Sequence, residues 1–265
     1  NPAVTVPLSF EPAQTSFSLV NSLACARAAL LAYSERDAVR ATASQWGFID
    51  AETFRKGRNE AAVFCDRDVI LVAFRGTDRL NDFITNLNIL YRRSPIGGFV
   101  HRGFMSAVAT FWPDLLQYVR AHRTSDQRVW FTGHSLGGAL AVLASIKTHF
   151  EDGVPVTGVY TFGQPCIGTV GFCTRFSQRC PYPLFRFVNH TDAVADAPMI
   201  TLLEHVGEVR YFDVDRKLWQ GEPPWKLRLR DRIKASRERG GLADFHAHAM
   251  KDYVSLIAGE AGLVS

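Results

Sequence analysis

Runs of consecutive apolar residues constrain the fold of this chain more than any other feature of its sequence. Residues 69–74 (VILVAF) contain no polar side chain, which is typical of a strand that is buried on both faces. Residues 62–74 predict a β-hairpin that turns at Asp66-Arg67 and has this run as its second arm. A strand without a polar side needs helices on both faces of its sheet.

Helical and strand-like segments alternate along the rest of the chain. Helices are expected over residues 18–36, 104–122, 136–150, 170–179 and 245–258. Strands are expected over residues 128–133, 156–163 and 184–189, and an edge hairpin arm over residues 205–214. Strands separated by helices predict an α/β fold with a mostly parallel central sheet and helices on both faces.

Length and composition fit one domain. The 265 residues are 47% hydrophobic, which is enough to fill a sizeable core, and no repeat or Pro/Gly/Ser-rich linker divides them. A single domain over residues 1–265 is therefore expected. No apolar run approaches the ~18 residues that span a bilayer. The chain starts at Asn1-Pro2 without an initiator Met or a signal sequence, so we expect a soluble chain whose original N-terminus has been removed.

The five cysteines do not predict a metal site or a disulfide scaffold. They are Cys25, Cys65, Cys166, Cys173 and Cys180, and no C-x-x-C pair occurs among them. Cys173 and Cys180 are close enough in sequence for a local bridge, which remains an open alternative to free thiols.

Residues 133–137 (GHSLG) match the pattern G-x-S-x-G, in which a serine lies on a tight turn between a strand and a helix. The predicted strand 128–133 ends at this motif and the predicted helix 136–150 begins in it, which is the context that the motif requires. The alternative is an ordinary serine in a Gly-rich turn, and the position between strand and helix argues against it. Ser135 is therefore a candidate nucleophile.

A serine hydroxyl is a weak nucleophile unless a base takes its proton and an acid orients that base. In this kind of fold the chain order is Ser, then Asp or Glu, then His. His246 and His248 are the histidines that lie beyond every predicted strand, and both are candidate bases. Asp192 follows the strand 184–189 and is the candidate acid, with Asp196 as its rival.

Acyl transfer also needs hydrogen-bond donors for the oxyanion that develops on the substrate. One backbone N–H comes from the residue after the nucleophile, here Leu136, and another from a loop after an earlier strand. Arg75-Gly76-Thr77 follows the strand 69–74 and is such a loop, so Thr77 is the second candidate. Residues 78–90 form an amphipathic segment, which is either a short core-facing helix or a lid over the active site.

Several short motifs occur in a fixed order over roughly residues 62–255. They are Phe74-Arg75-Gly76-Thr77, VHRGF at 100–104, TGHSLGGA at 132–139, FGQP at 162–165, RFVN at 186–189 with Asp192, and His248 with Tyr253. Together they resemble the class 3 (fungal-type) lipases, which have the α/β-hydrolase fold. The resemblance implies a lid after the oxyanion residue, at about residues 78–90.

The resemblance also implies the roles of five residues. Ser135 is expected to be the nucleophile, Asp192 the acid, His248 the base, and Thr77 and Leu136 the oxyanion hole. The family pattern places a tyrosine five residues after the catalytic histidine, which favours His248 over His246. The spacing of the acid to Val194 favours Asp192 over Asp196.

The function expected from these residues is that of a serine carboxylic-ester hydrolase that acts on lipid esters through an acyl-enzyme, and a triacylglycerol lipase is the expected type. Phospholipase A1 and feruloyl-type esterase are alternatives, because sequence does not show the shape of the substrate pocket. A lipase-like binding or signalling protein without catalysis is the alternative outside the enzymes. The chemistry requires no cofactor and no metal. The expected partner is a lipid ester at a lipid–water interface, and a monomer is favoured.

The charge of the chain is concentrated in one segment. Residues 216–239 contain nine Lys or Arg and three Asp or Glu, and Trp225, Leu229 and Ile233 recur every four residues among them. The simplest interpretation of this basic insertion is a helix whose apolar stripe packs on the core. The alternative is a helix that docks on an anionic membrane surface. No nucleic-acid partner is expected, and secretion is favoured over a cytoplasmic location.

Overall fold

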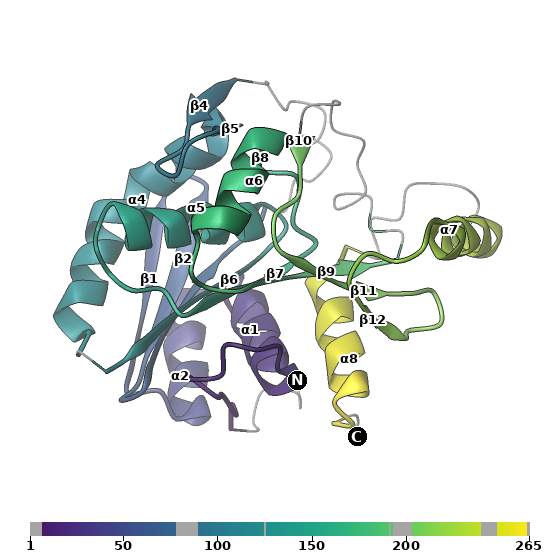
Figure 1. Ribbon diagram of the computed structural model, residues 1–265. Helices are drawn as coiled ribbons and strands as arrows, with labels where there is room; N and C mark the ends of the chain where they lie inside the picture. The colour runs from purple at the N-terminus through teal and green to yellow at the C-terminus, as the bar shows by residue number, and fades with distance from the viewer. Residues whose placement is uncertain are drawn as a thin grey trace.

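The computed structural model of the chain describes residues 7–77, 90–124, 126–190, 192, 203–239 and 248–263. These residues form an eight-stranded sheet, a smaller four-stranded sheet and helices around them (Figure 1). The helices are α1 (Leu19–Leu31), α2 (Arg36–Trp46), α4 (Arg102–His122), α5 (Leu136–Phe150), α6 (Val170–Arg179), α7 (Trp225–Arg239) and α8 (Met250–Glu260). The strands of the large sheet are β1 (Asp50–Lys56), β2 (Asn59–Cys65), β3 (Val69–Phe74), β6 (Arg128–His134), β7 (Gly158–Phe162), β9 (Leu184–Asn189), β11 (Glu208–Phe212) and β12 (Leu218–Gln220). Those of the small sheet are β4 (Tyr91–Arg93), β5 (Phe99–His101), β8 (Gly168–Thr169) and β10 (Leu203–Glu204).

The large sheet has a parallel centre and antiparallel edges. Its strand order is β1-β2-β3-β6-β7-β9-β11-β12. Strands β3, β6, β7, β9 and β11 run parallel to one another, whereas β1, β2 and β12 pair antiparallel with their neighbours. The carboxyl ends of the five parallel strands therefore meet at one edge of the sheet, where ligands bind in open α/β folds.

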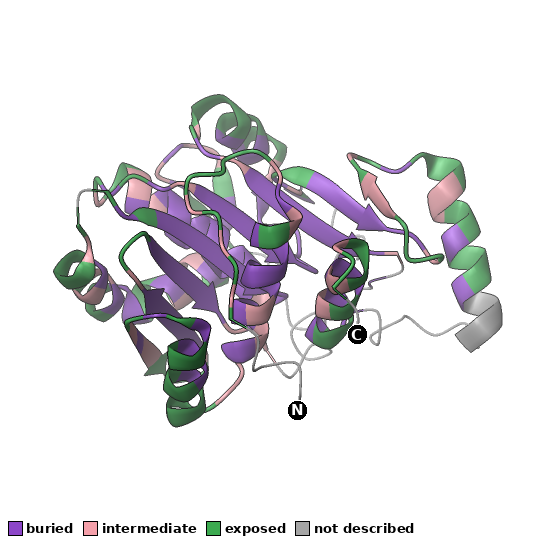
Figure 2. Ribbon diagram, turned by 90° about the horizontal axis from the view of Figure 1, so that it is seen from below, coloured by how far each residue is buried: buried purple, intermediate pink, exposed green. Residues whose placement is uncertain are grey.

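Helices cover both faces of this sheet, and the sheet separates the two large hydrophobic cores. Helices α4, α5 and α6 lie on one face, and α1, α2 and α8 lie on the other (Figure 1). Alternate residues of β3 point into the two cores: Ile70 and Val72 pack with the first set of helices, and Leu71 and Ala73 with the second. Buried residues accordingly occupy both faces of the central strands (Figure 2).

The predicted fold class is confirmed, since the central sheet is mostly parallel and helices flank both of its faces. The predicted helix 136–150 has the bounds of α5, and the predicted hairpin 62–74 corresponds to β2 and β3. The prediction that residues 205–214 form an edge arm is wrong in one respect. Strand β11 pairs antiparallel with β12 as a hairpin should, but it also pairs with β9, so the edge strand is β12.

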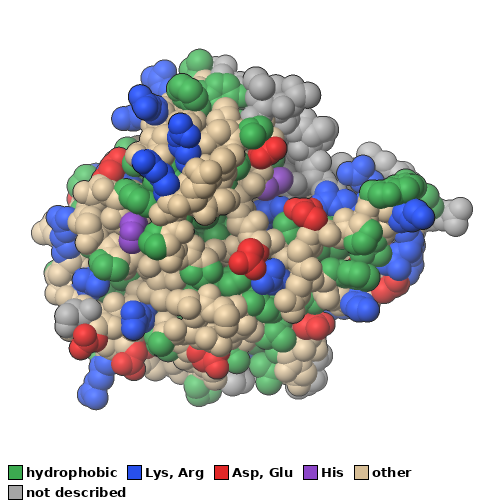
Figure 3. Space-filling view, in the orientation of Figure 1, with side chains coloured by type: hydrophobic (Ala, Val, Ile, Leu, Met, Phe, Trp, Pro, Cys, Tyr) green, Lys and Arg blue, Asp and Glu red, His purple; other side chains and the backbone are tan. Residues whose placement is uncertain are grey.

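Helix α7 confirms a predicted helix and corrects its expected orientation. Trp225, Leu229 and Ile233 are 69%, 48% and 47% exposed, so the apolar stripe does not pack on the core. Figure 3 shows hydrophobic side chains beside Lys and Arg on this outlying helix. The opposite side of α7 faces the sheet, where the carboxylate of Asp231 is fully buried and accepts a 2.8 Å hydrogen bond from the Tyr211 hydroxyl. Leu227 on the same side packs against Val188, Val209 and Tyr211, so the helix meets the sheet through these contacts and not through the apolar stripe.

Two further predictions concern a disulfide bridge and the lid. The five cysteines are all free thiols, so the local bridge between Cys173 and Cys180 is not formed. The predicted lid at residues 78–90 lies outside the described residues except for Leu90. Within the described ranges, no helix combines the length and the apolar character that crossing a membrane requires.

Candidate active site

The turn between β6 and α5 holds Ser135 in an unusual backbone conformation. Ser135 has φ 57° and ψ −128°, in a region that residues other than glycine rarely adopt. Helix α5 begins at the next residue, and its first turn packs directly on the end of β3. A Cβ at Gly137 would lie 2.2 Å from the carbonyl oxygen of Phe74, so only glycine fits this contact. The close approach brings the N-terminus of α5 to the loop that follows β3.

That loop is the predicted oxyanion loop, residues 75–77. A Cβ at Gly76 would lie 3.2 Å from the Cβ of Ser135, which places the loop against the predicted nucleophile. Leu136 is the first residue of α5, where backbone N–H groups have no acceptor within the helix and the helix dipole is positive. The structure thus brings Ser135, Leu136 and the loop of Thr77 to one place.

Asp192 and His248 form a buried pair. The Nδ1 atom of His248 lies 2.8 Å from both carboxylate oxygens of Asp192, and neither side chain is exposed. The Tyr253 hydroxyl donates a third hydrogen bond to Asp192 Oδ2 at 2.6 Å and accepts one from the backbone N–H of Asn189 at 3.0 Å. Burial, and then the neighbouring carboxylate, hold the pKa of Tyr253 well above its ordinary value. The hydroxyl therefore stays protonated and remains a donor.

Two atoms of the predicted triad would exchange a proton during the reaction. Ser135 Oγ and His248 Nε2 are both buried, and neither makes a hydrogen bond within the described part of the chain. The serine–histidine hydrogen bond is thus not formed here. Such contacts are often long before substrate binds and shorten in the reacting complex. Both atoms lie beside the ends of neighbouring strands, because the Ser135 N–H donates to the Phe162 carbonyl and the next residue, Gly163, contacts His248.

His134 connects these elements and was not predicted as a functional residue. Its Nε2 lies 2.6 Å from the carbonyl oxygen of His248, which only accepts, so Nε2 carries the proton. Its Nδ1 then accepts the hydrogen bond from the Tyr33 hydroxyl at 2.8 Å. A neutral imidazole thus satisfies both contacts and fixes the backbone at His248. No sequence signal marks Tyr33, whereas His134 lies inside the G-x-S-x-G motif as its unspecified residue.

The structure brings together the five predicted site residues. The rival candidates Asp196 and His246 both lie outside the described residues. Tyr253, quoted from sequence only as a family marker, makes a direct contact with the predicted acid. Within the described ranges no three His, Cys, Asp or Glu side chains are grouped closely enough to hold a metal ion.

The sequence is similar to those of known lipases and phospholipases. Residues 71–202 match the family described as Lipase (class 3). The secreted mono- and diacylglycerol lipase 1 of Fusarium solani is 32% identical over 138 residues, which are 51% of this chain and 40% of that protein. The chloroplastic phospholipase A(1) DAD1 of Arabidopsis thaliana is 26% identical over 259 residues, which are 83% of this chain and 55% of that protein. The chain thus spans about half the length of these two relatives, or less.

A solved structure shows the same fold. The lipase of Rhizopus microsporus var. chinensis superposes with a TM-score of 0.62 at 21% identity and covers 86% of each chain. The fold is that of the α/β hydrolases. Through residues 71–202 the chain belongs to the class 3 lipase family, whose members act on lipid esters.

The protonation of His134 predicts how stability depends on pH. Burial first, and then the neighbouring His248, lower the pKa of His134 from 6.5 to about 3. Between these two values the unfolded chain binds a proton that the folded chain does not, so stability falls as pH drops from 6.5 toward 3 and is fully retained above 6.5. We expect His134→Gln to make the slope of the unfolding free energy shallower by about 1.4 kcal/mol per pH unit, the value for one proton. Urea unfolding between pH 4 and 7 measures it, and parallel slopes for the two proteins would contradict the prediction.

Proposed function

We propose that the protein is a serine carboxylic-ester hydrolase that acts on lipid esters in the manner of a triacylglycerol lipase. Ser135 is the nucleophile, His248 the general base, and Asp192 the acid that orients His248. The backbone N–H groups of Thr77 and Leu136 form the oxyanion hole. The observation that carries the proposal is the buried His248–Asp192 pair beside a serine on a strained turn.

The reaction follows from these positions. His248 Nε2 takes the proton from Ser135 Oγ as the oxygen attacks the ester carbonyl, and Nδ1–H stays bonded to Asp192. The N–H groups of Thr77 and Leu136 stabilise the oxyanion, and the alcohol leaves with the proton from His248. Water then attacks the acyl-enzyme with His248 again as base, which releases the acid and restores Ser135. The charge of Asp192 stabilises the imidazolium in both steps.

The relatives support a lipid ester as the substrate class. The two relatives described above are named as a mono- and diacylglycerol lipase and a phospholipase A(1). A protein of this fold without catalysis is the competing possibility, and measured turnover of any carboxylic ester excludes it.

Removing the proposed nucleophile tests the chemistry directly. We expect Ser135→Ala to abolish turnover of p-nitrophenyl butyrate, because losing a triad serine typically costs several orders of magnitude in rate. Ser145→Ala is the matched control, since Ser145 is equally buried in α5 and its hydroxyl contacts the Val142 carbonyl and the Tyr182 hydroxyl, away from the proposed site. More than about 1% of the wild-type rate in Ser135→Ala, measured on folded protein, would rule out the assignment.

Removing the Tyr253 hydroxyl should have a smaller effect on the same reaction. Tyr253→Phe removes one donor from Asp192, so the carboxylate holds His248 less firmly. We expect kcat to fall roughly two- to ten-fold, the equivalent of about 0.5–1.5 kcal/mol for one hydrogen bond, while KM for a small soluble ester stays unchanged. Tyr182→Phe removes a buried hydroxyl away from the site and is the control. Equal kinetics for the wild-type protein and Tyr253→Phe would show that the contact does not support the reaction.

We also propose that α7 places the protein on an anionic membrane surface. Trp225, Leu229 and Ile233 form an exposed apolar stripe, and three cationic side chains, those of Lys226, Arg230 and Lys234, line the same face. An apolar stripe between cationic side chains matches the acyl chains and head groups of an anionic lipid layer.

The cations on α7 differ in how free they are to meet such a surface. Arg230 lies 3.3 Å and 3.2 Å from the carboxylates of Asp213 and Asp215, and Lys234 lies 2.6 Å from Asp215. Lys226 makes no ion pair with any described residue and lies over the Trp225 ring, 5.8 Å from its centroid. Lys226 and the apolar stripe are therefore the groups to change, because replacing Arg230 or Lys234 would also disturb how α7 is held.

Vesicle binding tests this contact. We expect Leu229→Ser with Ile233→Ser, and separately Lys226→Glu, each to reduce co-sedimentation with phosphatidylglycerol vesicles at least about five-fold, since about 1 kcal/mol is lost per buried apolar group or surface charge. Ile49→Ser is the control, because Ile49 is 70% exposed on another part of the molecule. Unchanged binding in both α7 variants would contradict the proposal. Hydrolysis of a small soluble ester should stay constant in every variant.

A further inference from the structure

A basic hollow opens beside the proposed oxyanion loop. It has a volume of about 330 Å³ and is lined by Arg55, Arg58, Glu60, Arg75, Gly76 and Thr77 together with Gly57. Gly76 belongs both to this hollow and to the contact with Ser135, since a Cβ there would lie 3.2 Å from the serine Cβ. Gly76 therefore lies between the hollow and Ser135, the residue whose hydroxyl oxygen is proposed to attack the ester.

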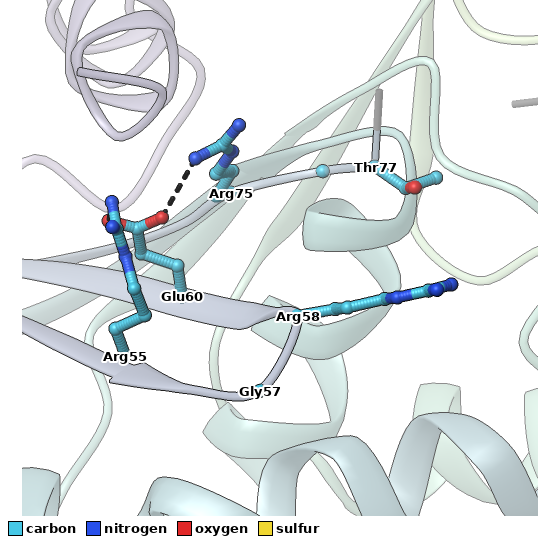
Figure 4. A pocket seen from close by; sticks show the side chains of 7 residues that line it. Arg55, Gly57, Arg58, Glu60, Arg75 and Thr77 are labelled. Atoms are coloured by element: carbon cyan, nitrogen blue, oxygen red, sulfur yellow. Dashed lines mark hydrogen bonds and ion pairs between the residues drawn. The ribbon is translucent and has the colours of Figure 1, made fainter. Parts of the chain in front are cut away.

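Two of its three arginines are held by a buried carboxylate. The Glu60 side chain is 5% exposed and lies 2.8 Å from the Arg55 guanidinium and 2.9 Å from that of Arg75 (Figure 4). The Arg75 guanidinium also lies over the ring of Tyr33, 5.4 Å from its centroid. These contacts fix one wall of the hollow and leave its lining with more positive than negative charge.

Arg58 differs from the other two arginines of the hollow because it makes no ion pair with the described residues. It is exposed, and no carboxylate of the described residues lies within ion-pair distance of it. Arg58 occupies the two-residue turn between β1 and β2, where Lys56 pairs with Asn59 and Gly57 takes φ +62° as its neighbour in the turn. Because β2 pairs antiparallel with β3, this turn lies at the end of the sheet where β3 leads to Thr77. Figure 4 shows the Arg58 side chain extending from the turn toward the side on which Thr77 lies.

We infer that this hollow binds the phosphate of a glycerophospholipid whose acyl ester reaches Ser135. The inference rests on the proposed hydrolysis of lipid esters by Ser135 and adds glycerophospholipids to triacylglycerols as a substrate class. A guanidinium offers a planar set of N–H donors that matches the oxygens of a phosphate, and such charge-assisted hydrogen bonds are stronger than neutral ones. In a glycerophospholipid only the short glycerol unit separates the phosphate from the acyl esters. An ester carbonyl between Ser135 and Thr77 thus leaves the phosphate within reach of the neighbouring hollow.

A soluble pair of substrates separates this site from membrane binding through α7. Dihexanoyl-phosphatidylglycerol and dihexanoylglycerol carry the same acyl chains, and below their aggregation limits neither presents a surface. We expect Arg58→Gln to lower kcat/KM for the phospholipid about ten-fold and to change that for dihexanoylglycerol less than two-fold. Arg67→Gln is the matched control, because Arg67 is an exposed arginine in the β2–β3 turn at the opposite end of β2.

The outcomes distinguish the inference from the function on which it rests. A wild-type protein that hydrolyses neither ester contradicts the proposed function. A wild-type protein that hydrolyses dihexanoylglycerol but not the phospholipid overturns the inference alone, and so does equal kcat/KM for the phospholipid in the wild-type protein and Arg58→Gln. An equal loss on both substrates would show a general role of Arg58 and would also overturn it.

Binding to an inactive variant gives a readout that does not depend on turnover. In a Ser135→Ala background, calorimetric titration with dihexanoyl-phosphatidylglycerol should show a Kd about ten-fold weaker once Arg58→Gln is added. Inorganic phosphate is titrated in parallel to separate a lipid head group from free phosphate. If phosphate alone binds as tightly as the lipid, the hollow is a site for the free anion and the head-group assignment fails.

Discussion

The backbone at Ser135 is the constraint on which the rest of the site depends. A residue other than glycine in such a region costs about 1–3 kcal/mol and persists only where its surroundings fix it. Here β6 and α5 are both buried, and the contact of Gly137 with the Phe74 carbonyl lets the helix start immediately above the sheet. The same contact fixes the loop of Thr77 next to the start of α5. One steric condition thus positions both the proposed nucleophile and the proposed oxyanion donors.

The carboxylate of Asp192 imposes the second condition, because a fully buried charge needs several donors. His248 Nδ1 and the Tyr253 hydroxyl supply two, and they come from the segment that begins α8 rather than from the sheet. The Tyr253 hydroxyl in turn accepts from Asn189 at the end of β9. Helix α8 is therefore joined to the sheet by the same contacts that orient His248, so the position of the base depends on how the terminal helix packs.

The central part of this architecture was predictable because its signals are local. A run such as 69–74 has no polar face, so its burial follows from sequence, and the helix over 136–150 follows from small apolar residues after a G-x-S-x-G turn. Strand β1 is half-exposed and the strands of the small sheet have two or three residues, so neither gives a clear pattern. The contact of Tyr33 with His134 joins residues 101 positions apart and has no sequence signature. Asp192 and His248 were predicted through chain order, their positions relative to the predicted strands, and a family pattern.

Helix α7 shows why periodicity alone does not give orientation. Its apolar stripe recurs every four residues, and a helix normally buries such a stripe. Here the opposite face of α7 meets the sheet: Asp231 accepts a hydrogen bond from the Tyr211 hydroxyl, and Leu227 packs against Val188, Val209 and Tyr211. The helix therefore contacts the sheet through one polar and one apolar contact that lie outside its four-residue apolar repeat, and the stripe with Lys226 faces outward.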